Sequence, residues 1–109
     1  MLMHSNFDDP LELKDARTIV AKGPLVWGPG PGQCKIDVVI TQGSLSAPGH
    51  TGNWNQDDDS WDCDVQLPSN QQWDPSQPVH CVGTATPPPV NTWDPQDVSL
   101  ERKQAATPA

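Results

Sequence analysis

Three stretches of the chain alternate apolar and polar residues with the two-residue period of a β-strand, and each carries a cysteine on its apolar side. They span residues 34–42, 60–67 and 79–86. Successive side chains of a strand point to opposite faces, so such a row marks a strand with one buried face. The rows predict six buried side chains, namely Ile36, Val38, Ile40, Trp61, Val65 and Leu67.

The remainder of the chain favours the same class of structure. Its 109 residues include 13 Pro and 8 Gly, which favour turns over long helices. The β-branched run at Thr18, Ile19 and Val20 predicts a further strand at 17–22, although a short helix beginning at Pro10 is the alternative. We therefore expect an all-β fold, a small antiparallel β-sandwich of about five to seven short strands with many loops. The arrangement resembles immunoglobulin-like sandwiches in architecture alone.

Three segments make up the expected organisation: residues 1–16 as an N-terminal arm, 17–102 as the β-sandwich domain, and 103–109 as a C-terminal tail or linker stub. The first residues lack the basic and apolar regions of a signal peptide. Nothing in the chain is long and apolar enough for membrane insertion.

The negative net charge of the chain restricts the classes of partner that it is expected to bind. It contains 14 acidic and 6 basic residues, for a formal net charge of −8. Nucleic acids and anionic membranes are bound through Lys and Arg, so neither is an expected partner. A protein partner or self-assembly is the favoured interaction, and carbohydrate is the alternative.

The three cysteines all fall on predicted core faces. If 60–67 and 79–86 form a hairpin, the register that pairs Cys63 with Cys81 also matches the two apolar rows. We therefore expect a Cys63–Cys81 disulfide, with Cys34–Cys81 as the alternative by analogy with immunoglobulin cores. Three buried free thiols that act as small apolar side chains are the remaining possibility. A disulfide would indicate an oxidising compartment, and hence a secreted protein or one on a cell or particle surface.

Five carboxylates lie within eight residues, at Asp57, Asp58, Asp59, Asp62 and Asp64. Hard oxygen ligands on a loop and the adjoining strand face suit Ca²⁺, so these residues are candidate metal ligands. However, their spacing matches no calcium loop, and a solvated acidic loop explains them equally simply. We expect the loop to extend into water and the protein to need no cofactor, with Ca²⁺ as the alternative.

Three tryptophans, Trp54, Trp73 and Trp93, lie in or beside predicted loops. An exposed indole can stack on a sugar ring or fill a pocket of a partner, and Asn53 and Asn55 beside Trp54 suit sugar hydroxyls. These five residues are the ligand-binding candidates. The alternative is that each indole covers an open end of the core.

The favoured function is a non-enzymatic binding or structural module that is secreted, surface-displayed or part of a larger assembly. The alternative is a carbohydrate-binding module that uses Trp and Asp and is assisted by calcium. A small metal-dependent or cysteine hydrolase is the least favoured class, because the chain has no nucleophile, phosphate or dinucleotide motif. We therefore expect no catalytic residues.

Overall fold

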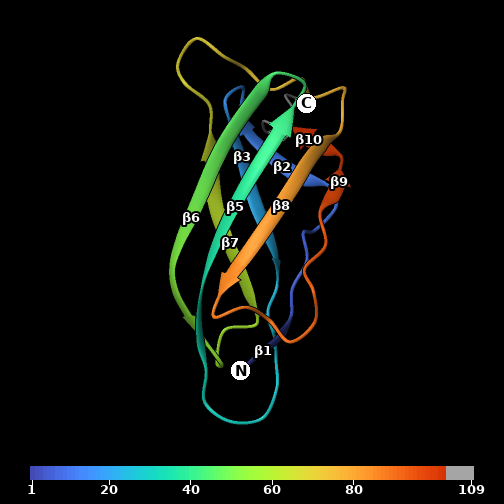
Figure 1. Ribbon diagram of the computed structural model, residues 1–109. Helices are drawn as coiled ribbons and strands as arrows, with labels where there is room; N and C mark the ends of the chain where they lie inside the picture. Colours follow the sequence, from blue (N-terminus) through green and yellow to red (C-terminus); the bar gives the residue numbers. More distant parts are fainter. Residues whose placement is uncertain (103–109) are drawn as a thin grey trace, which may run out of the picture.

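Residues 1–102 are described by the computed structural model, and they form an all-β fold without a helix (Figure 1). The strands in this part of the chain are β1 (Leu2–His4), β2 (Leu11–Asp15), β3 (Thr18–Pro24), β4 (Val26–Trp27), β5 (Gln33–Gln42), β6 (Leu45–Asn55), β7 (Ser60–Gln66), β8 (Val79–Thr86), β9 (Gln96–Val98) and β10 (Leu100–Arg102). The four strands that the sequence predicts are present as β3, β5, β7 and β8. The predicted tail at 103–109 lies outside the described residues.

Two four-stranded sheets and one two-stranded ribbon contain these strands. Sheet I has the order β10–β2–β3–β7, sheet II has the order β6–β5–β8–β9, and β1 pairs with β4. Neighbouring strands are antiparallel except β10 and β2, which run parallel. In Figure 1, β6, β5 and β8 of sheet II lie in front of β2, β3 and β7 of sheet I. Residues 1–16, predicted as an arm, contribute β1 and β2, and β2 is an inner strand of sheet I.

The inner rows of both sheets belong to one buried cluster. In sheet I, Ile19 on β3 lies opposite Val65 on β7, and both are fully buried. In sheet II, Val38 on β5 lies opposite Gly83 on β8. The predicted core is confirmed, since Ile36, Val38, Ile40, Trp61, Val65 and Leu67 are each at most 1% exposed.

The predicted disulfide is wrong, because Cys34, Cys63 and Cys81 are all free. The prediction assumed a hairpin between β7 and β8, but β7 pairs with β3 in sheet I and β8 pairs with β5 in sheet II. The alternative bridge fails for another reason. Cys81 lies opposite Ile40, six residues along β5 from Cys34, which corresponds to a separation of about 20 Å. The argument from a disulfide to an oxidising compartment therefore loses its basis.

The long connection between β7 and β8 closes one end of the molecule. Its Trp73 donates from the backbone N–H to the carbonyl of Ala16 and from the indole N–H to the carbonyl of Arg17, both at 2.9 Å. The amide of Gln42 donates to the carbonyl of Asp74 at 2.8 Å and accepts the backbone N–H of the same residue at 2.7 Å. These bonds tie the connection to a hairpin of each sheet.

Candidate functional site

Two of the three tryptophan candidates are buried. Trp73 is 3% exposed and Trp93 is 8% exposed. The ring of Trp93 packs in a cluster with Phe7 and Trp61, with ring centroids 5.3 Å and 5.6 Å away, and covers Gly83. Since their faces are occupied by the protein itself, these indoles fill the core and do not form platforms for a ligand.

The third candidate, Trp54, is half-buried at the end of β6, beside the exposed Asn53 and Asn55. Its indole N–H is buried and has no hydrogen-bond partner among the described residues. The side chain of Asn55 is already used in the turn that follows, where its Oδ1 accepts the backbone N–H of Asp57 at 2.9 Å. The carbohydrate-binding alternative therefore depends on Trp54 and Asn53.

The acidic residues are spread over a turn and a strand instead of converging. Asp62 and Asp64 lie on the outer face of sheet I, where Asp62 is opposite Lys22 and the Oδ2 of Asp64 is 3.3 Å from the Nζ of Lys14. In the turn, the Oδ2 of Asp58 accepts the backbone N–H of Asn55 at 2.9 Å. Within residues 1–102, no group of three or more His, Cys, Asp or Glu side chains is placed to hold a metal ion.

Burial makes the three thiols poor nucleophiles. It raises the pKa of Cys63 to about 12, with smaller contributions from Asp62 and Asp64. It raises the pKa of Cys81 to about 12 as well, with a contribution from Asp97, and it raises the pKa of Cys34. Because the reactive species is the thiolate, all three cysteines are inert near neutral pH.

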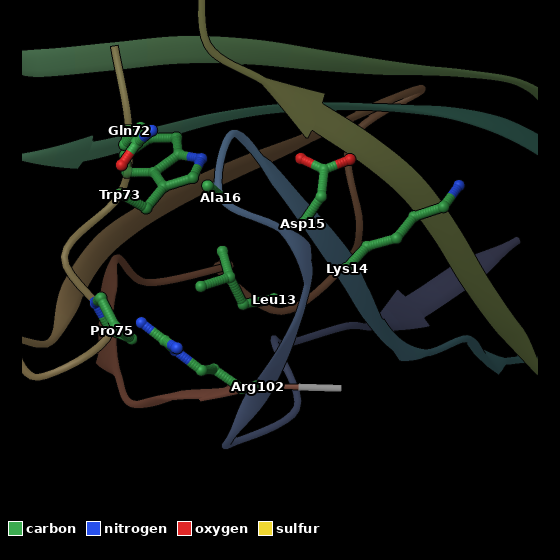
Figure 2. Close-up of a pocket in the computed structure, with 8 residues that line it drawn as sticks. All are labelled: Leu13, Lys14, Asp15, Ala16, Gln72, Trp73, Pro75 and Arg102. Atoms are coloured by element: carbon green, nitrogen blue, oxygen red, sulfur yellow. The ribbon is translucent and has the colours of Figure 1, made fainter. Parts of the chain in front are cut away.

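A cavity of about 290 Å³ lies where β2, the β7–β8 connection and β10 meet (Figure 2). Its lining residues are Leu13, Lys14, Asp15, Ala16, Gln72, Trp73, Pro75 and Arg102. Figure 2 shows Arg102 reaching toward Pro75, whereas Lys14 points away on the far side of Leu13. The backbone N–H of Arg17 donates a hydrogen bond to Asp15, and this bond, together with bonds from the hydroxyl and backbone N–H of Thr18, lowers the pKa of Asp15, so its carboxylate stays charged. The lining carries one carboxylate, Asp15, and two cations, Lys14 and Arg102, of which Lys14 is paired with Asp64 outside the cavity, so the charges of the lining indicate no ligand class.

The outer face of sheet II carries an apolar row that the sequence analysis missed. Val39 on β5 lies directly opposite Val82 on β8, and these side chains are 43% and 36% exposed. On its other side Val39 lies opposite the exposed Pro48 of β6. The row crosses three neighbouring strands in the middle of the sheet. The signal in the sequence is a valine at one of the polar positions in two of the three alternating stretches, Val39 in 34–42 and Val82 in 79–86.

One imidazole–carboxylate pair flanks this row on each side. The Nδ1 of His50 is 2.7 Å from the Oδ1 of Asp37, across β6 and β5. The Nδ1 of His80 is 2.8 Å from the Oδ1 of Asp97, across β8 and β9. The term "valine face" is used below for the outward side chains of Asp37, Val39, Pro48, His50, His80, Val82 and Asp97.

Comparisons of the chain with protein-family models, with curated proteins and with solved structures find no match. No helix in residues 1–102 has the length and apolar character needed to cross a membrane. The fold therefore defines the class, an all-β protein of mainly antiparallel sheets, and the valine face is its candidate interaction site.

Proposed function

We propose that this protein is a non-enzymatic β-sandwich module of immunoglobulin-like type that binds another protein through its valine face. The strand order supports the architecture. Strands β2, β3 and β7 share one sheet, β6, β5, β8 and β9 share the other, and the chain passes from one sheet to the other between β6 and β7 and again between β7 and β8. Such crossing connections are the mark of Greek-key sandwiches.

The single observation that carries the functional proposal is the exposed row of Pro48, Val39 and Val82. A sheet with one face on the core normally turns polar side chains to water on the other face. Here apolar side chains occupy the middle of the outer face, and polar side chains surround them. An apolar centre with a polar rim is the usual composition of a protein–protein interface.

A module of this kind works on a cell or particle surface or as a subunit of an assembly, because its valine face needs a protein partner at hand. Carbohydrate binding would instead use Trp54, which lies on the inner side of sheet II, opposite Cys34. The two functions therefore use different surfaces of the molecule and can be separated by mutation.

Site-specific photo-cross-linking tests the proposal. A photo-reactive amino acid is placed at Val39 and, as a matched control, at Val26, which is 46% exposed on the β1–β4 ribbon. Irradiation of the cells that make the protein is expected to give discrete protein adducts at position 39 and few at position 26. Equal labelling at both positions, or no adduct at position 39, would contradict the proposal.

A further inference from the structure

We infer that the protein bound at the valine face is a second copy of this chain, docked face to face with its strands crossing at close to a right angle. This inference rests on the proposed function, but it can be wrong while the proposed function is right. The observations that support it are the diagonal placement of the two imidazole–carboxylate pairs and the exposed apolar row between them.

The register of sheet II fixes the positions of the two pairs. On β5, Asp37 is one step from Val39 toward one end of the sheet, and His50 lies beside it on the edge strand β6. On β8, His80 is one step from Val82 toward the other end, and Asp97 lies beside it on the edge strand β9. The two pairs therefore occupy diagonal corners around the apolar row.

Four simple arrangements place one valine face on another by twofold rotation, with the axis along the strands, across them, or along either of the two diagonals. When the axis runs along the strands or straight across them, the charged pairs meet the hydroxyl residues Thr41, Ser46 and Thr84. When the axis runs diagonally, the strands cross near 90°, which is an established mode of sheet packing. Of the two diagonals, only one puts His50 of one copy opposite Asp97 of the other, whereas the second puts each of these residues opposite its own counterpart.

The diagonal arrangement makes that contact twice, as symmetry requires of an interface that uses the same patch on both subunits. It also brings the two apolar rows across each other at the centre. Within one copy, His50 and Asp97 lie on opposite edges of the sheet, about 20 Å apart by strand spacing and residue rise. Any coupling between these two side chains must therefore pass between copies.

The size of the face predicts the strength of the association. Four strands at normal spacing are about 19 Å wide, so two such sheets crossed at a right angle overlap over a footprint of about 360 Å² per copy. Two such footprints give about 700 Å², which is below the area that stable complexes bury and in the range of weak, transient contacts. We expect a weak, reversible dimer with a dissociation constant of about 100 μM or above. The net charge of −8 opposes it, so measurements at about 0.15 M salt, where charges are screened beyond about 8 Å, are appropriate.

Sedimentation equilibrium of the purified full chain from about 10 μM to about 1 mM tests the dimer in the concentration range expected for such a weak contact. The mass is expected to rise from 11.8 kDa toward twice that value. Val39→Arg is expected to remain a monomer throughout, whereas Val26→Arg dimerises like the unmodified protein. A monomer at every concentration, or equal loss in both variants, would overturn the inference. If cross-links to another protein still form at position 39 in cells, the proposed function survives.

A charge exchange tests the crossing geometry. Asp97→Lys is expected to weaken the dimer about fivefold, because a lysine then faces His50 of the other copy. Adding Asp37→Lys and His50→Glu to the same chain keeps a pair of opposite charge across β5 and β6, restores a Lys–Glu contact between copies and is expected to recover the affinity. Thermal melting of each variant checks that the fold is retained. Recovery supports the right-angle arrangement, and a triple variant as weak as Asp97→Lys excludes it.

Discussion

The two sheets are alike on the inside and different on the outside. Both contribute alternating apolar rows to one core, such as Ile19 in sheet I and Ile36 in sheet II, each 0% exposed. Outside, sheet I is charged, with Lys22 opposite Asp62 and Lys14 beside Asp64. Sheet II instead has valines at the centre of its outer face.

This difference separates what holds the fold from what the fold presents. The inner rows of the two sheets have the same apolar composition, because burial of apolar area stabilises either sheet equally well. The outer faces are free of that requirement, so their composition reflects solubility or binding. On sheet I, cross-strand pairs of opposite charge keep the surface soluble, with little effect on stability. On sheet II, exposed valines cost solubility, which is consistent with a surface that is covered by a partner.

The largest expected effects come from the inner rows. Ile19→Ala and Ile36→Ala should each lower the free energy of unfolding by about 3 kcal/mol, since both remove fully buried atoms and leave a cavity. Urea denaturation measures the change, and Val39→Ala, on the outer face, should cost under about 0.5 kcal/mol. If only one isoleucine variant is strongly destabilised, the two sheets do not share the core equally.

A smaller loss of stability is expected at Gly83, where the inner face of sheet II has no side chain. A Cβ on Gly83 would overlap the indole of Trp93, so Gly83→Ala must push that ring out of place. We expect a cost of about 2 kcal/mol by overpacking. Gly52→Ala is the matched control, because a Cβ there meets nothing within 4 Å. Equal stability of the two variants would show that Trp93 does not close the core in solution.

The two-residue alternation of apolar and polar residues was sufficient to predict which side chains form the inner rows of the sheets. Ile36, Trp61 and Val65 stand at alternate positions between polar neighbours, so strand geometry alone decides which face they occupy. The same alternation does not predict which strands pair with one another. A connection of about a dozen residues between β7 and β8 fits a long hairpin as well as a crossing between sheets, and the assumed hairpin gave the wrong disulfide.

The residues of the candidate site were harder to predict, because their burial and exposure depend on contacts between segments that are distant in the sequence. The burial of Trp93 depends on the absence of a side chain at Gly83, ten residues away, and on Phe7 near the other end of the chain. Strands of two or three residues, such as β4 and β9, show no period at all. The alternation of 34–42 already puts Val39 on the outer face, but only the strand pairing shows that Val82 of β8 and Pro48 of β6 lie beside it.

A further prediction concerns the thiols of the two inner rows, Cys63 and Cys81. Above pH 9.0, the ordinary thiol pKa, the unfolded chain loses these protons, whereas burial keeps them on the folded protein up to about pH 12. The unfolded state then binds fewer protons, so stability falls as pH rises through this window. Between pH 8.5 and pH 10.5 the melting temperature should fall by at least about 4 °C more than in a variant with both cysteines changed to Ala.

Thiol counting completes that test. The denatured, unreduced protein should give three reactive thiols per chain, because all three cysteines are free. The folded protein should give almost none at pH 8, where the buried thiols are protonated. A count of one thiol after denaturation would reveal a disulfide, and the connectivity of sheets I and II would then need revision.

The smallest expected effect is that of calcium on the acidic residues of sheet I and the turn before β7. Asp62 and Asp64 are exposed and lie next to lysines, and the Oδ2 of Asp58 accepts a backbone N–H of its own turn. Each carboxylate thus has water or a donor nearby, and their repulsion is screened by salt. Titration with Ca²⁺ from micromolar to millimolar at fixed ionic strength should leave the melting temperature unchanged.

The control for this experiment is Mg²⁺ at the same ionic strength, which separates a specific site from general screening. A ligand that binds only the folded protein raises its stability with the logarithm of ligand concentration. A rise of several degrees that saturates with Ca²⁺, is absent with Mg²⁺ and is reversed by a chelator would therefore mean that the carboxylates converge on an ion. Sheet I would then carry a ligand site of its own, and the contrast between its charged outer face and the apolar outer face of sheet II would no longer separate solubility from binding.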